Sequence, residues 1–170
     1  RDLGIASINF DLIFGLPLQT NESIHTTMNL VTQIKPETIA FYSYAHVPWK
    51  IKHQKILEKY EMATGTDKMK FYEIGKEILL QSDYNELGFD HFTLKEDPLY
   101  LAYKDQSLQR NFMGYTTKSS NILIALGASS ISSSKNRFVQ NEKNAVKYMQ
   151  AMKEDKLCLV DGHTHSSLDL

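Results

Sequence analysis

Residues that could take part in chemistry stand near the ends of apolar segments in this sequence. Asp11 lies within the apolar segment Ile5–Leu16, and His46 and His91 stand in or just after later segments that are rich in apolar and aromatic residues. A carboxylate buried in such a segment is costly unless it has a partner. We therefore expect Asp11 either to accept hydrogen bonds from a ligand or to form a salt bridge or cap inside the fold.

The two histidines leave two interpretations open. At neighbouring strand ends, His46 and His91 could form a metal-binding pair or an acid/base pair, because imidazole binds metals and titrates near neutral pH. Hydrogen-bonded structural roles fit the same pattern.

Strands and helices alternate along the first part of the chain. The segment Ile5–Leu16 is typical of a buried parallel strand. A helix is expected to begin at Thr20, because apolar residues then recur every three or four positions until Pro36. The segment Thr38–Tyr44 is β-branched and aromatic and predicts a second strand.

Later segments continue this alternation and indicate the fold class. We expect a helix at 50–61, a helix capped by Asp67, strands at 87–92 and 121–131, and a helix from about Asn141. The order predicts an α/β fold with a parallel sheet or barrel. Ligands of such folds bind beyond the carboxyl ends of the strands, which here are residues 15–17, 45–49, 90–92 and 127–131.

Composition and charge exclude several classes of function. The net charge of -1 over 170 residues does not suit a protein that neutralises many phosphates, so we expect no nucleic-acid partner. The sequence lacks an apolar run of roughly 20 residues, so no membrane span is expected. Its single cysteine, Cys158, cannot supply the thiolates of an iron–sulfur cluster or a structural zinc site. We predict a cytoplasmic monomer without a metal site of its own.

Four motifs in register point to one family. They are Asp11-Leu12-Ile13-Phe14-Gly15-Leu16-Pro17, Tyr44-Ala45-His46-Val47-Pro48-Trp49, Gly88-Phe89-Asp90-His91-Phe92 and Arg110-Asn111-Phe112-Met113-Gly114-Tyr115-Thr116-Thr117. In order and approximate spacing, the sequence from Asp2 to Asn141 resembles the oxygen-independent coproporphyrinogen III oxidases (coproporphyrinogen dehydrogenases), which are radical S-adenosylmethionine (SAM) enzymes.

The sequence also departs from the pattern of that family. Gln109, Met113 and Ala125 stand where relatives usually have histidine, glutamine and glycine. The Cys-x3-Cys-x2-Cys cluster motif of the family is absent. The absent motif and the start of the sequence at Arg1 lead us to expect an internal piece of a longer enzyme. We expect this piece to be inactive alone and the cluster ligands to lie outside this chain.

The resemblance implies a fold, cofactors and a reaction. It implies later strands of a TIM-like radical SAM (β/α) barrel over residues 1–131 and the beginning of a C-terminal helical region over 132–170. The implied reaction is oxidative decarboxylation of two propionates of coproporphyrinogen III to vinyl groups, a step of haem biosynthesis that uses SAM, a 4Fe-4S cluster and an unidentified electron donor and acceptor. The positions that match the family's SAM contacts are Asp11, Ala45 and Ile131.

Three residues near the last motif are candidates for binding the substrate. Arg110, Tyr115 and Lys118 could contact the propionates, because a guanidinium pairs bidentately with a carboxylate. A solvated surface loop is the alternative interpretation of these residues.

Two rival functions remain open at this point. A haem-binding chaperone of the same superfamily would keep the barrel without the oxidase activity, with a histidine such as His46 on the haem. The segment Asp161–Ser166 contains His-x-His, which is typical of metal-dependent hydrolases, although such a site would need further ligands.

Overall fold

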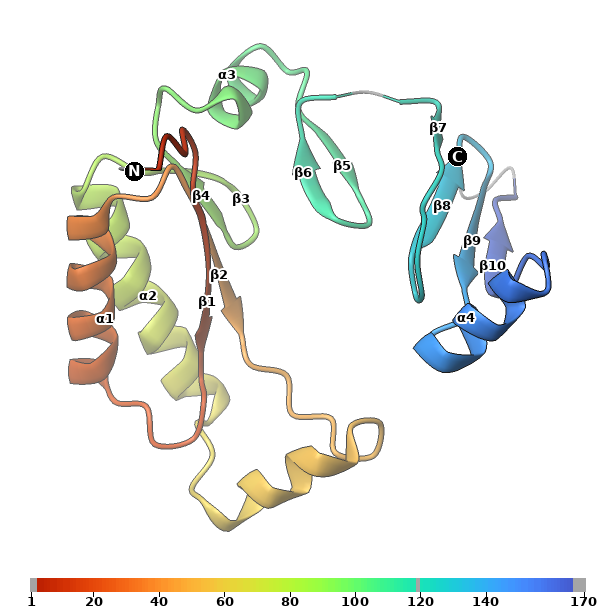
Figure 1. Ribbon diagram of the computed structural model, residues 1–170. Helices are drawn as coiled ribbons and strands as arrows, with labels where there is room; N and C mark the ends of the chain where they lie inside the picture. Colours follow the sequence, from red (N-terminus) through yellow and green to blue (C-terminus); the bar gives the residue numbers. More distant parts are fainter. Residues whose placement is uncertain (1–2, 119, 167–170) are drawn as a thin grey trace. The chain divides into compact units, whose positions relative to one another are not determined.

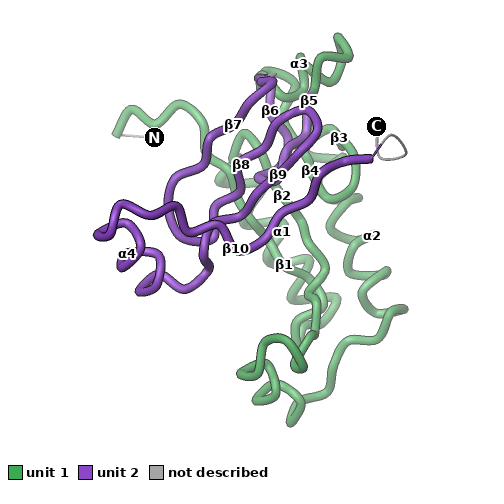
Figure 2. The backbone as a smooth tube through the Cα atoms, turned by 90° about the vertical axis from the view of Figure 1, so that its right-hand side faces the viewer, with its two compact units in different colours: residues 1–108 green, residues 109–170 purple. Residues whose placement is uncertain are grey.

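The computed structural model describes residues 3–118 and 120–166. The chain divides into two compact units, residues 1–108 and 109–170 (Figure 2), and each is described by itself. This division lies earlier than the barrel boundary that we expect at residue 131, and that boundary stays a prediction. None of the described helices is both long and apolar enough to cross a membrane.

Unit 1 is built on a four-stranded mixed sheet (Figure 1). Its strands, in the order β1-β2-β4-β3, are β1 (Asn9–Phe14), β2 (Thr38–Ser43), β4 (His91–Thr93) and β3 (Asn85–Gly88). Strands β1 and β2 are parallel, as the strand–helix–strand pattern predicts. Strand β4 is antiparallel to both of its neighbours.

The expected single strand at 87–92 is wrong, because the chain reverses inside it. Gly88 and Phe89 have positive φ angles of 129° and 54°, and the turn that they form separates β3 from β4. A bulky residue in the left-handed region is uncommon and has no signal in the hydrophobic pattern.

Two helices cover one face of this sheet, α1 (Asn21–Ile34) and α2 (Gly65–Gln81) (Figure 1). The core between the helices and the sheet contains Phe14, Ile24, Met28, Val31, Ile39, Phe41, Phe71, Leu79, Tyr84 and Phe92. The predicted start of α1 is confirmed, since Thr20 is its N-cap and forms a capping box with Ser23. The face opposite to these helices carries the candidate site.

The N-terminus of α2 corrects one prediction. Its N-cap is Thr64, and Asp67 is the third residue of the helix and completes a capping box. The amide of Asp67 donates to Thr64 Oγ1 at 3.2 Å, and the Thr64 amide donates to Asp67 Oδ2 at 2.9 Å. The hydrogen bonds from the Thr64 hydroxyl and amide hold the pKa of Asp67 below its ordinary value. The stabilisation from its ionised form is therefore present above the ordinary carboxyl pKa and is lost as the pH falls through the lowered pKa.

Substitution of this cap gives the first testable prediction. We expect Thr64→Ala to lower the free energy of unfolding by about 1 kcal/mol, because α2 loses its side-chain cap. Urea unfolding of the full-length protein measures this change. Thr66→Ala, an exposed threonine in the first turn, is the matched control and is expected to be nearly neutral. Equal effects of the two substitutions would show that the cap contributes nothing.

Two shorter helices complete unit 1. The expected helix at 50–61 is present as a 3-10 helix, η1 (Lys52–Lys59), and α3 (Pro98–Lys104) follows the sheet with Asp97 as its N-cap. The helix η1 matters most for the site, because its side chains bind the loop that follows β2.

Unit 2 contains two antiparallel sheets. A hairpin is formed by β5 (Gln109–Asn111) and β6 (Gly114–Thr116). The second sheet has the order β10-β9-β8-β7 and consists of β10 (Leu159–Thr164), β9 (Arg137–Asn141), β8 (Ile131–Ser134) and β7 (Ile122–Leu123). The helix α4 (Ala145–Lys153) lies between β9 and β10 in the sequence and is capped by Asn144.

The expected strand at 121–131 is largely wrong. Only Ile122–Leu123 pairs as β7, and the chain then forms a loop in which Gly127 and Ser129 have positive φ angles of 103° and 62°. Strand β8 begins at Ile131, at the end of the predicted strand, and returns antiparallel to β7.

Candidate active site

The face of the unit 1 sheet opposite to α1 and α2 carries Asp11. Side chains alternate along β1, so Phe10, Leu12 and Phe14 face the core, and Asp11 lies on the opposite face. The carboxylate is exposed, not buried among apolar residues as its sequence surroundings suggest. Asn9 Nδ2 donates to Asp11 Oδ1 at 2.8 Å. This side chain is thus held by a neighbour and accessible to a ligand.

A tyrosine and a histidine share this face with Asp11. The rings of Tyr42 and His91 meet edge to face, with 6.1 Å between their centroids. Burial raises the pKa of Tyr42, and the nearby carboxylates of Asp11 and Asp90 raise it further. His91 Nδ1 lies 2.7 Å from Asp90 Oδ1. The face therefore combines two carboxylates, a phenol and an imidazole.

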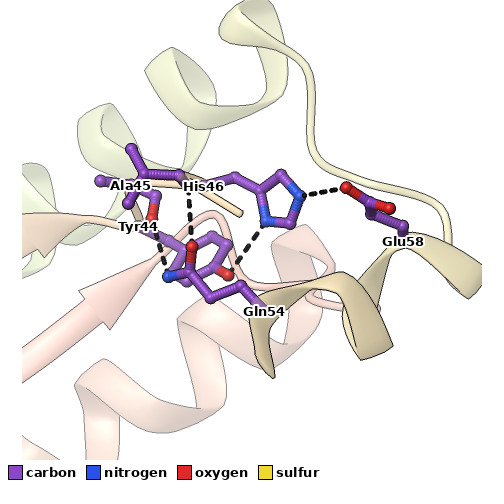
Figure 3. A network of polar contacts seen from close by, with 6 residues as sticks. Tyr44, Ala45, His46, Gln54 and Glu58 are labelled. Carbon is purple, nitrogen blue, oxygen red and sulfur yellow. Dashed lines mark hydrogen bonds and ion pairs between the residues drawn. The ribbon is translucent and has the colours of Figure 1, made fainter. Parts of the chain in front are cut away.

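The loop that follows β2 is fixed by a glutamine of η1 (Figure 3). Gln54 Nε2 donates to the carbonyl oxygen of Ala45 at 3.1 Å, and the amide of Val47 donates to Gln54 Oε1 at 2.7 Å. One side-chain amide thus binds two backbone groups of the loop, as a neighbouring strand would. The backbone of Ala45, one of the three residues that we predict to contact SAM, is held in place by this clamp.

His46 belongs to the same network (Figure 3). Its Nδ1 lies 3.2 Å from the hydroxyl oxygen of Tyr44, and its Nε2 lies 3.4 Å from Glu58 Oε1. These contacts support the hydrogen-bonded interpretation of His46, whereas the contacts of His91 are an ion-pair distance to Asp90 and a ring contact with Tyr42. Residues 3–118 and 120–166 contain no cluster of three or more metal-binding side chains.

A lysine of α2 connects the ends of β1 and β2. Lys68 Nζ donates to the carbonyl oxygen of Tyr44 at 2.9 Å. Its aliphatic part passes Gly15, where an added Cβ would lie 2.8 Å from Lys68 Cε. Gly15 also has a φ of 81°, so the Gly-Leu-Pro turn needs glycine there for its backbone conformation and for space.

A second glutamine fixes the end of β1. Gln19 Oε1 accepts from the amide of Leu16 at 2.9 Å, and Gln19 Nε2 donates to the carbonyl oxygen of Ile13 at 3.1 Å. The Gly-Leu-Pro turn therefore has a side-chain clamp of the same kind as the loop after β2.

The clamp by Gln54 gives a second testable prediction. We expect Gln54→Leu to lower the free energy of unfolding by roughly 1–3 kcal/mol and to speed hydrogen exchange at the Val47 amide, because two hydrogen bonds are lost. Exchange followed by mass spectrometry measures the local effect. Lys55→Leu, at the exposed neighbouring position, is the control. Unchanged exchange at Val47 would rule out the clamp.

Unit 2 brings two of the predicted substrate residues together. Arg110 and Tyr115 are directly opposite in the β5–β6 hairpin, and the guanidinium carbon lies 5.8 Å from the centroid of the tyrosine ring. Ile131, the third residue that we predict to contact SAM, begins β8 opposite Gln140 and is half-buried. Asp11 and Ala45 therefore lie in unit 1, whereas Arg110, Tyr115 and Ile131 lie in unit 2.

The two histidines of the His-x-His motif lie side by side. The ring centroids of His163 and His165 are 5.3 Å apart, and both rings contact Phe138. The described part of the chain brings no third metal ligand to them. A hydrolase centre would need one, so the structure gives this rival no support.

Comparisons with known proteins point to one family, although no family model matches the sequence. The chain is 32% identical over 169 residues to the anaerobic coproporphyrinogen III oxidase 1 of Cereibacter sphaeroides and 39% identical over 152 residues to the oxygen-independent enzyme of Helicobacter pylori. These matches cover 99% and 89% of this chain. This chain is homologous to the oxygen-independent coproporphyrinogen III oxidases.

A solved structure agrees with this result. The coproporphyrinogen III oxidase (HemN) of Escherichia coli, described as a radical SAM enzyme, matches 99% of the chain with a TM-score of 0.92 and 33% identity. The expected fold class, part of a radical SAM fold with mixed α/β content, is thereby confirmed, and the described sheets do not close into a barrel. The chain spans 37% and 33% of the two oxidases and 39% of the solved chain.

Proposed function

We propose that this chain forms the SAM-binding and substrate-binding part of an oxygen-independent coproporphyrinogen III oxidase, which converts two propionates of its substrate to vinyl groups. The observation that carries this proposal is the homology to named oxidases over nearly the whole chain, together with the TM-score of 0.92. The exposed carboxylate of Asp11 and the loop that Gln54 holds give unit 1 polar groups that can bind a ligand.

The residues of unit 1 fit a SAM molecule. The carboxylate of Asp11 is exposed on the sheet face opposite to α1 and α2 and can accept hydrogen bonds from amino or hydroxyl donors of SAM. The carbonyl oxygen of Ala45 accepts one bond from Gln54 and has a second lone pair for a ligand. Ile131, in unit 2, would pack on the adenine.

The residues of this chain do not fit the cluster. A 4Fe-4S cluster needs several thiolates, and Cys158 is the single cysteine of the sequence. In such enzymes SAM and the cluster together supply the radical that abstracts hydrogen from the substrate. The task of the residues described above is to bind and orient the ligands.

Arg110 and Tyr115 would bind a propionate of the substrate. The guanidinium offers two parallel N–H donors to a carboxylate, and the ring of Tyr115 supports its position. An electron donor and an acceptor complete the set of partners that the reaction requires.

One experiment separates this function from a haem-binding chaperone. Full-length protein, reconstituted anaerobically with iron and sulfide, is incubated with SAM with and without coproporphyrinogen III, and SAM cleavage is measured. We expect cleavage that rises when the substrate is present. Tight haem binding in an absorbance titration, without substrate-dependent SAM cleavage, would favour the chaperone instead.

A further inference from the structure

Unit 2 contains a groove whose lining includes two phenylalanines and a histidine. It has a volume of about 540 Å³ and is lined by residues of β5, β8, β9 and the segments beside them. Phe112 and Phe138 meet in it with 5.0 Å between ring centroids, and the ring of His165 lies 6.1 Å from Phe138. Small-molecule sites commonly have roughly 300–1,000 Å³, so the groove has room for much more than one small ion.

Cations gather along this groove and the two hollows that adjoin it. The neighbouring hollows, of about 310 and 640 Å³, share Arg110 and Arg137 with the groove and add Lys118 and Lys135. Among the described residues that line the three hollows there is no aspartate or glutamate. The whole chain has 20 acidic and 19 basic residues, so this excess of positive charge is local.

Arg137 is a cation of this groove that a side-chain hydrogen bond holds in place. It begins β9 and is exposed, and its Nε donates to Thr164 Oγ1 at 3.2 Å. That bond uses one of the five N–H donors of the guanidinium. The amide of His165 donates to the carbonyl oxygen of Asn136 at 2.8 Å, which fixes the end of β10 beside the β8–β9 turn. The guanidinium is therefore held in the lining of the groove that Phe112 and Phe138 share.

We propose that this groove binds a carboxylate-bearing tetrapyrrole and that Arg137 is a specificity-determining residue for one carboxylate of the substrate. The inference rests on the proposed function and deepens it, because it adds a second guanidinium to Arg110 for a substrate with several propionates. The apolar surface of a pyrrole ring packs on the phenylalanines, and the guanidinium pairs with the carboxylate.

Binding of coproporphyrin III, the stable oxidised form of the porphyrinogen, tests this inference. Fluorescence titration of full-length protein is expected to show that Arg137→Gln weakens binding about tenfold, because one charge-assisted hydrogen-bonded pair is lost. Arg137→Lys is expected to recover part of the loss. Lys147→Gln, which removes an exposed positive charge of α4, is the matched control and is expected to leave binding unchanged.

The outcomes separate this inference from the proposed function. Equal binding by Arg137→Gln and Lys147→Gln overturns the groove proposal, even if the wild-type protein converts coproporphyrinogen III. Complete displacement of the porphyrin by excess inorganic phosphate also overturns it, because the site would then be one for simple anions. Weakened porphyrin binding by Arg137→Gln in a protein without turnover supports the groove and rejects the oxidase function. Thermal unfolding checks that each variant is folded.

Discussion

Gly75→Val is expected to lower the free energy of unfolding of the protein by about 3 kcal/mol, because it overpacks the core of unit 1. Gly75 is a buried residue of α2, and an added Cβ would overlap the ring of Phe41 and lie 2.9 Å from Met28 Cε. Phe41 and Met28 are each 1% exposed, so neither has room to move away. The gain in helix propensity on replacing glycine is well below this cost.

Chemical denaturation of the full-length protein measures this effect, and the chain offers a matched control. Gly65 begins the same helix, and an added Cβ there would meet nothing within 4 Å. We expect Gly65→Val to change the free energy of unfolding by only a few tenths of a kcal/mol. A loss of similar size in both variants would mean that close packing against Phe41 does not explain the glycine at 75.

Asp11→Asn is expected to reduce SAM affinity and SAM cleavage by about a hundredfold while the protein remains folded, because a charge-assisted acceptor of the ligand is lost. Asp11 is exposed and its replacement is isosteric, so the core is unaffected. Calorimetric titration with SAM and the cleavage assay measure the two effects. Asp83→Asn, at an exposed position of unit 1, is the control.

Tyr42 reports independently on whether the geometry of this face is correct. Because the Asp11 carboxylate contributes to the raised pKa of Tyr42, Asp11→Asn should move that pKa back toward its ordinary value. A difference titration of tyrosine absorbance measures the shift. A shift without loss of SAM binding would leave Asp11 as a structural neighbour of Tyr42 and remove its assigned role.

The regular part of unit 1 could be predicted from the sequence. A helix between Thr20 and Pro36 and a strand at Thr38–Tyr44 follow from periodicity, caps and β-branched content, and both are found. The hairpin at 85–93 could not be predicted in this way, because its turn places Phe89 at a positive φ. The predicted strand at 121–131 is wrong over residues 124–130 for a similar reason. Gly127 and Ser129 have positive φ angles there, and the apolar segment does not pair as a strand.

The site was only partly predictable. Glycine and the family motifs indicate the strand ends. The exposed position of Asp11 was not predicted, because its apolar neighbours suggest a strand that is buried on both faces. The clamping role of Gln54 has no sequence signal, because its backbone partners lie seven to nine residues earlier and depend on the fold of η1. The same holds for Lys68, whose contact with Tyr44 requires α2 to pack across the sheet.

The measurement that tests the central claim most directly is product analysis after anaerobic turnover. Full-length protein with a reconstituted cluster is supplied with SAM, a reductant, an electron acceptor and coproporphyrinogen III, and the porphyrins are oxidised and separated by chromatography. We predict accumulation of protoporphyrin with two vinyl groups, and much less of it with Asp11→Asn. Unchanged coproporphyrin in the presence of an intact cluster would contradict the assignment of this chain to a coproporphyrinogen oxidase activity.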